Sequence, residues 1–128
     1  MAHKIGIVAF MSGFLALSVP LSAHHGGASF DTTKTVTVKG TVTDFIWTNP
    51  HVLVRLDVKD ASGTVTNWVV EVWNPVTQSS RGWTKDTFKA GDEVSLEVTA
   101  AKNGRPIGMI RGSIVINGKE FKELRGGE

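Results

Sequence analysis

The sequence contains no cysteine among its 128 residues, so disulfide bonds, thiolate metal sites and a cysteine nucleophile are excluded. It also lacks a basic block, because 14 lysines and arginines stand against 12 acidic residues along the whole chain. Nucleic-acid binders carry a clustered positive charge on one face or along one helix. We therefore expect no nucleic acid among the partners of this protein.

The short motifs of several enzyme classes are missing as well. The chain has no G-x-S-x-G, no H-E-x-x-H and no phosphate-binding glycine loop in front of a helix. Ser79 and Ser80 are adjacent, but nothing in the sequence pairs either of them with a base. We therefore expect a protein that binds a partner rather than an enzyme.

Residues 1–23 have the features of a secretory signal. Lys4 precedes an apolar run over 5–17, Pro20 interrupts that run, and the small residue Ala23 suits cleavage. The run is too short for a comfortable membrane span. We predict cleavage after Ala23, a periplasmic or secreted location, and no stable membrane anchor afterwards.

The remaining chain divides by composition into three parts. Residues 24–35 are rich in histidine and glycine and predict a polar arm, residues 36–124 predict one β-barrel domain, and residues 125–128 predict a frayed tail. A domain of this size has one modest core. Without disulfides, it must rely on that core for stability.

Apolar and polar residues alternate with a period of two along most of the predicted domain, which indicates half-buried strands. Asn74 and Pro75 predict the start of a short helix, and Gly82 predicts its end. The expected elements, in order, are strands at 36–47, 51–58 and 65–73, a helix at 75–81, strands at 93–99 and 107–116, and a short strand near Phe121. This order predicts a small OB-fold-like five-stranded barrel, with an open β-sandwich as the alternative.

Two irregularities are expected in the first strand. Gly40 falls within the apolar series, which predicts a bulge or a sharp bend. Phe45 and Trp47 are out of phase with Val42, which predicts a bend near Asp44.

Several rarer residues recur in an order that resembles a family of small exported bacterial proteins classed as a domain of unknown function. The matching segments are His24-His25, Phe30-Asp31, Gly40-Thr41-Val42, Trp47-Thr48-Asn49-Pro50-His51, Trp68-Val69-Val70-Glu71, Arg81-Gly82-Trp83, Gly91-Asp92-Glu93-Val94 and Gly104. Gly26-Gly27 departs from this pattern, since Ser-Phe is commoner there in the family. The resemblance implies export and a small β-barrel, and it implies no established activity.

Three of the four histidines follow the predicted cleavage site. Cleavage after Ala23 would give His24 a free amine beside its imidazole, and His25 or His51 would add a further nitrogen. Such a set suits Cu(II), which favours nitrogen ligands. Zn(II) could instead use the three histidines with a carboxylate such as Glu71 or Asp31. The simpler alternative is that His24 and His25 are only polar residues at a cleavage site and that His51 only starts a strand.

Aromatic residues give a second hypothesis. Trp68 and Trp83 are expected in the core and at the barrel base, whereas Trp47 and Trp73 fall outside the inward register. An aromatic patch on an OB-type barrel face would stack bases or sugar rings, and exposed aromatic side chains often mark binding surfaces. Trp47, Trp73 and Arg55 are therefore candidate ligand-binding residues. For Trp47, packing at a barrel end is the preferred interpretation, and for Trp73 packing and ligand binding are equal alternatives.

Glu71 is the one acidic residue in an otherwise apolar third strand, and the simplest partner for it is Arg55 on the neighbouring strand. The leading hypothesis is an exported, non-enzymatic module that holds a transition metal, copper before zinc, through His24 and His51. Binding of a small molecule, a saccharide or a protein through an aromatic barrel face is the first alternative. A structural or assembly role in the cell envelope through an exposed strand edge is the second.

Overall fold

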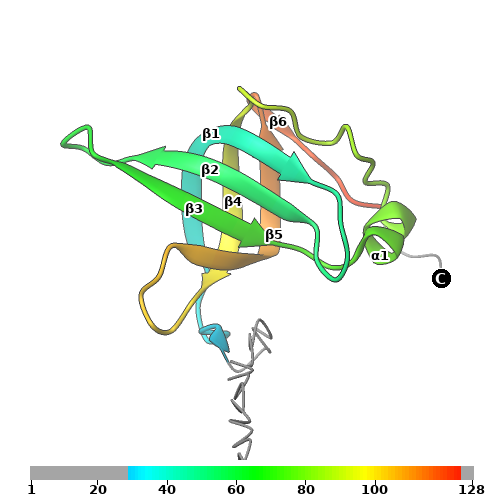
Figure 1. The fold of residues 1–128 in the computed structure, drawn as a ribbon, viewed down its shortest axis with the longest axis horizontal. Coiled ribbons are helices and arrows are strands. Elements are labelled where there is room, and N and C mark those ends of the chain that lie inside the picture. The colour runs from blue at the N-terminus through cyan, green and yellow to red at the C-terminus, as the bar shows by residue number, and fades with distance from the viewer. Residues whose placement is uncertain (1–28, 125–128) are drawn as a thin grey trace, which may run out of the picture.

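The computed structural model describes residues 29–124 of the chain. Its elements are β1 (Val36–Ile46), β2 (Leu53–Lys59), β3 (Val65–Glu71), α1 (Pro75–Ser80), β4 (Glu93–Ala100), β5 (Ile107–Ile116) and β6 (Lys119–Glu120). Figure 1 shows the strands curving around one core, with α1 at one side of the barrel, joined to the end of β3 by a short connecting segment. No helix in this part of the chain is long and apolar enough to cross a membrane.

The five longer strands form a closed barrel. They are ordered β3-β2-β1-β4-β5, with β6 beside β5, and β3 also pairs with β5 in parallel. That last contact joins Val69 to Ile107, Val70 to Gly108 and Glu71 to Met109. A closed barrel in this strand order, with one helix between the third and fourth strands, is an OB-fold. The predicted fold class is confirmed, and the open sandwich is not formed.

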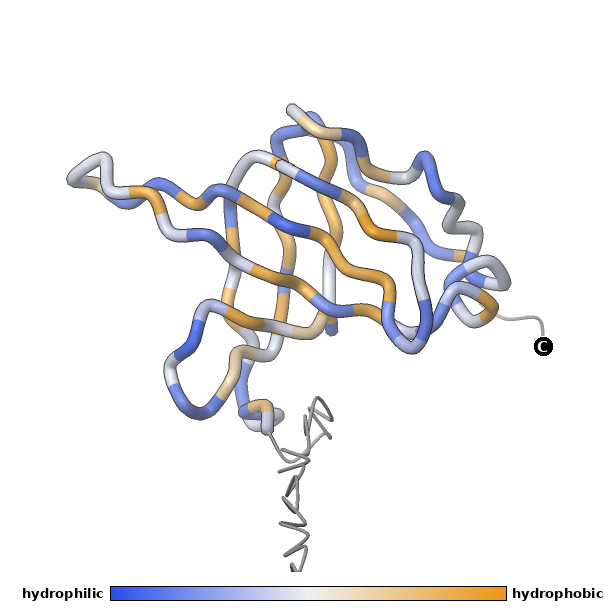
Figure 2. The backbone as a smooth tube through the Cα atoms, in the orientation of Figure 1, coloured by the Kyte–Doolittle hydropathy of each residue, from blue (hydrophilic) through white to orange (hydrophobic). Residues whose placement is uncertain are grey.

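Alternation of apolar and polar side chains explains the strands. Figure 2 shows hydrophobic and hydrophilic positions following one another along them. The inward positions form one buried cluster, and its fully covered members include Val42, Val54, Leu56, Val70, Leu96 and Val98. Because successive strand residues point to opposite faces, the intervening positions lie on the outside of the barrel.

Turn residues set most element boundaries where the sequence predicted them. The Asn74 side chain accepts a hydrogen bond from the Thr77 amide at 2.9 Å and caps α1. Gly82, just beyond the helix, has a φ of +85°, and the Asn117-Gly118 turn has positive φ at both residues. A left-handed backbone costs little for glycine, so this residue ends the helix at the expected place.

Aromatic side chains close one end of the barrel. Trp83 is buried and its ring centroid lies 5.4 Å from that of Phe88 and 5.6 Å from that of Phe121. Its indole N–H donates to Glu123 Oε1 at 2.6 Å, so the polar atom of the buried ring has a partner. Trp83 therefore packs a barrel end, as expected from its position after the helix.

The irregularity in β1 lies at one of the two expected places. Pairing with β2 shifts register between Val42 and Asp44, which confirms the predicted bend near Asp44. At Gly40 the ladder with β4 is continuous, so of the predicted bulge or sharp bend, the bulge is not formed. The glycine instead allows close approach of two strands, since a Cβ atom at position 40 would lie 2.5 Å from the backbone oxygen of Asp57.

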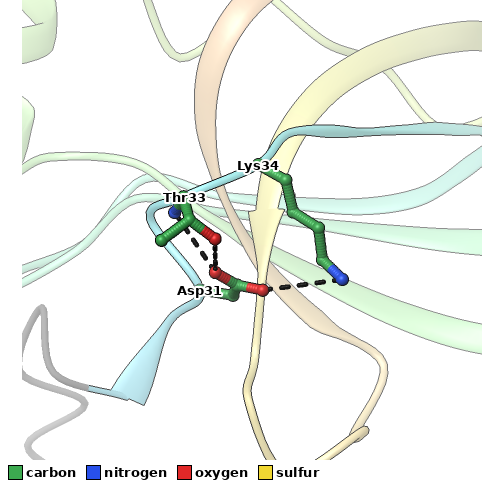
Figure 3. Close-up of polar contacts among 3 residues, drawn as sticks. All are labelled: Asp31, Thr33 and Lys34. Atoms are coloured by element: carbon green, nitrogen blue, oxygen red, sulfur yellow. Dashed lines mark hydrogen bonds and ion pairs between the residues drawn. The ribbon is translucent and has the colours of Figure 1, made fainter.

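The segment in front of β1 is fixed by a compact polar turn. Figure 3 shows Asp31 between Thr33 and Lys34. The amide and hydroxyl of Thr33 donate to Asp31 Oδ1 at 3.2 and 2.5 Å, and Lys34 Nζ lies 3.6 Å from Oδ2. The hydroxyl of Thr33, followed by its amide, lowers the pKa of Asp31, and Lys34 acts in the same direction. Both carboxylate oxygens thus have partners within the turn, which argues against Asp31 as a metal ligand.

The close approach at Gly40 predicts a stability effect. Gly40→Ala should lower the free energy of unfolding by about 1–3 kcal/mol, because the clash is with backbone that cannot move cheaply. Urea denaturation followed by tryptophan fluorescence measures this. The control is Lys39→Ala, an exposed neighbour in the same strand whose loss should change stability by less than about 0.5 kcal/mol. Equal midpoints for the two variants would contradict the packing argument.

The lowered pKa of Asp31 predicts a pH dependence. Its native carboxyl has a lower pKa than in the unfolded chain, so its contribution to stability is complete above about pH 4. That contribution is lost as the pH falls through the lower native pKa. We expect Asp31→Asn to flatten the acid limb of a stability-versus-pH curve, and Thr33→Val to change it in the same direction. Superposed acid limbs for wild type and both variants would show that the turn contributes nothing.

Candidate functional site

One histidine and one glutamate meet on the outside of the barrel. His51 follows the turn at Asn49 and Pro50, whose peptide bond is cis, and Glu71 is the last residue of β3. His51 Nδ1 lies 3.3 Å from Glu71 Oε2. The side chain of His51 is 32% exposed and that of Glu71 only 10%, so solvent reaches the pair from the histidine side.

Glu71 Oε2 is buried and accepts no hydrogen bond from any residue within 29–124. His51 is within ion-pair distance, but its ring nitrogen is not oriented as a hydrogen-bond donor to this oxygen. A buried carboxylate oxygen without a donor destabilises a fold, and native structures contain few of them. An oxygen of this kind, facing an imidazole nitrogen, is available to a cation.

Arg55 is not the partner of Glu71. The register of β2 and β3 places Leu53 opposite Glu71 and Val69 opposite Arg55. The expected Arg55–Glu71 ion pair is therefore wrong by two residues of register, which is about 7 Å along a strand. The side chain beside Glu71 is that of His51, which precedes β2 in the turn.

A methionine joins this pair through the barrel closure. Met109 of β5 is the register partner of Glu71, and paired residues on neighbouring strands share one face of a sheet. Both residues are buried, at 5% exposure for Met109 and 7% for Glu71 as whole residues, yet neither belongs to the central core cluster. No sequence motif marks Met109, because only the pairing of β3 with β5 places it next to Glu71.

The other predicted metal ligands are not placed by the structure. His24 and His25 lie outside the described residues. Among residues 29–124, no three side chains of histidine, cysteine, aspartate or glutamate gather into a group that could hold a metal ion. His51 and Glu71 are thus the two predicted ligands that the fold brings together.

The three residues of the predicted aromatic ligand site have different neighbours in the structure. Trp47 is half-buried and packs edge-on against Phe45, with ring centroids 6.0 Å apart. Trp73 is 40% exposed, and Arg111 Cζ lies 5.8 Å from the centre of its ring. Arg55 is exposed and lines a different pocket together with Trp68. Trp47, Trp73 and Arg55 do not form one site, and the role of each in ligand binding stays a prediction.

Solved structures similar to the chain include two crystal structures of Rim1, the mitochondrial single-stranded DNA binding protein of S. cerevisiae, one of them labelled with selenomethionine. Each aligns at 13% sequence identity with a TM-score of 0.48, covering 65% of this chain and 92% of the other. The expectation of no nucleic-acid partner was drawn from the charge of the chain, and it is corrected: a near-neutral net charge does not exclude such a partner. Single-stranded nucleic acids are held by local grooves and stacked aromatics, which a net charge does not report.

A search of curated proteins found no match to this sequence. The match to a sequence family is extensive, covers residues 13–111, and includes every strand from β1 to β4 as well as the first half of β5. This confirms the resemblance to a domain of unknown function that the sequence indicated. The chain belongs to the family described as a family of unknown function, DUF6152.

Proposed function

We propose that this protein is an exported binding module that holds a transition metal at His51 and Glu71, copper before zinc. The observation that carries the proposal is the buried Glu71 Oε2, which lacks a hydrogen-bond donor within residues 29–124 and faces His51 Nδ1 at 3.3 Å. Export rests on the predicted signal at residues 1–23, and the location is periplasmic or secreted.

The separation of the two ligand atoms suits a tetrahedral ion. Two ligands at about 2.0–2.1 Å from a tetrahedral ion lie about 3.3–3.4 Å apart, whereas ligands at a right angle lie about 2.8–3.0 Å apart. The 3.3 Å between Nδ1 and Oε2 corresponds to the first case. Zn(II) accepts tetrahedral coordination, and so does Cu(I). Both ions have a filled d shell, which imposes no preferred coordination geometry.

Met109 favours copper over zinc. Thioether sulfur is a soft ligand that selects Cu(I), whereas zinc sites use nitrogen, oxygen and thiolate. Met109 is the register neighbour of Glu71 on the same face of the sheet. Its sulfur is therefore a candidate further ligand for a copper ion bound at His51 and Glu71. His24, with its free amine, and His25 are the proposed further ligands from the processed N-terminus.

The proposal predicts how metal affinity depends on single residues. Protein whose N-terminus is shown by mass spectrometry to be His24 should bind Cu(I) and Cu(II) with sub-micromolar affinity, about −8 kcal/mol or better. His51→Ala and Glu71→Gln should each weaken binding by at least about tenfold, which corresponds to about 1.4 kcal/mol. Competition with a chelator of known affinity, under anaerobic conditions for Cu(I), measures this.

Matched variants separate the contributions. Met109→Leu should weaken Cu(I) and leave Zn(II) unchanged, and an extra glycine before His24 should weaken Cu(II). Glu120→Gln, an exposed carboxylate on β6, is the control and should bind as wild type does. Thermal unfolding of each variant confirms that it is folded. Equal affinities for wild type, His51→Ala and Glu71→Gln would rule out the site.

A further inference from the structure

A polar pocket lies between the end of β3, the helix α1, strand β5 and the C-terminal segment. Its volume is about 250 Å³, and its polar lining comes from Trp73, Gln78, Arg81, Arg111 and Glu123. Figure 1 shows α1 and the chain after β6 side by side at this end of the barrel. None of His51, Glu71 and Met109 lines the pocket, so it is separate from the proposed metal site.

The inner wall of this pocket contains a polar atom without a partner. Gln78 of α1 is 1% exposed, and its Oε1 accepts no hydrogen bond from the residues the structure describes. The helix itself does not need this side chain, because Asn74 caps its first turn. A buried amide oxygen left without a donor is costly unless another molecule supplies one. Gln78 therefore marks a place for a hydroxyl or amine group of a ligand.

The charged groups of the pocket favour an anion. Arg81 and Arg111 contribute two guanidinium groups against the single carboxylate of Glu123. That carboxylate already accepts from Trp83 Nε1 at 2.6 Å and lies 3.8 Å from Arg81 Nη1. Arg111 takes part in none of the ion pairs within residues 29–124 and lies over the ring of Trp73. The guanidinium group of Arg111 therefore has N–H donors available to bind a carboxylate.

Trp73 supplies an apolar surface at the same place. Trp73 is 40% exposed and lines the pocket, and exposed aromatic rings commonly mark binding surfaces. The pocket is slightly smaller than the roughly 300–1,000 Å³ of sites for drug-sized ligands, so its ligand is about one ring in size.

From these four features we propose that the pocket binds an acidic monosaccharide, a hexuronate, as a ligand distinct from the metal. The carboxylate contacts Arg111 and Arg81, a hydroxyl donates to Gln78 Oε1, and the ring packs against the indole of Trp73. The site does not depend on the metal proposal, because the two sets of residues do not overlap.

The test is a titration of the processed protein, free of added metal, with glucuronate and galacturonate, followed by tryptophan fluorescence and by NMR. Saturable binding at millimolar concentration is expected for a ligand of one ring. Glucose has the sugar ring but no carboxylate, and acetate has a carboxylate but no ring. Each should bind at least about tenfold more weakly than the uronate. Equal binding of glucose and glucuronate, or no saturable binding of either uronate, overturns the proposal.

Variants locate the binding. Arg111→Gln and Trp73→Leu should each weaken uronate binding by at least about tenfold, while Arg55→Gln, an exposed arginine on another surface, should bind as wild type does. Gln78→Leu should weaken binding without lowering the unfolding midpoint, because it removes an acceptor that has no donor within residues 29–124. Affinity that is unchanged in Arg111→Gln and Gln78→Leu would place the ligand elsewhere and overturn the assignment.

Discussion

The parallel pairing of β3 with β5 is the contact on which the rest of the structure depends. Three register pairs, from Val69–Ile107 to Glu71–Met109, turn an open antiparallel sheet into a closed barrel. Closure removes the free edges of both strands and surrounds the inward residues with apolar neighbours on all sides. It also places residues nearly forty positions apart in the chain beside one another. The outer surface at the ends of β3 and β5 exists only because of this contact.

Two buried acceptors in the described part of the chain differ from the other polar groups of the fold. Asp31, Asp60 and Asn74 each accept hydrogen bonds from nearby backbone or hydroxyl groups, and each thereby fixes a turn or a helix start. Glu71 Oε2 and Gln78 Oε1 have no such donor. Both belong to the stretch from the end of β3 to α1. Glu71 lies against the partly exposed His51, and Gln78 lines the pocket beside α1. Because the turn residues named above have hydrogen-bond donors, these two acceptors without donors are the strongest candidates for ligand contacts in the described part of the chain.

Much of the architecture follows from local rules that act over a few residues. Alternation identified each of the five long strands, since a half-buried strand requires it wherever one face meets the core. Asn74, Pro75 and Gly82 bounded the helix because capping and φ preferences do not depend on distant contacts. Gly40 shows the limit of this reasoning. A glycine within a strand is compatible with a bulge or with close approach, and only the position of Asp57 on the neighbouring strand decides between them.

The sequence by itself determined the order of strands and helix along the chain, the absence of thiol chemistry and the candidate status of His51 and Glu71. Tertiary structure decided which of the candidate residues meet. It set the register that pairs Glu71 with Leu53 rather than Arg55, placed Met109 beside Glu71, and separated Trp47 from Trp73. The physical reason is that alternation fixes the face a residue occupies but not its partner along the ladder. A shift of two residues keeps every side chain on its face and changes every neighbour.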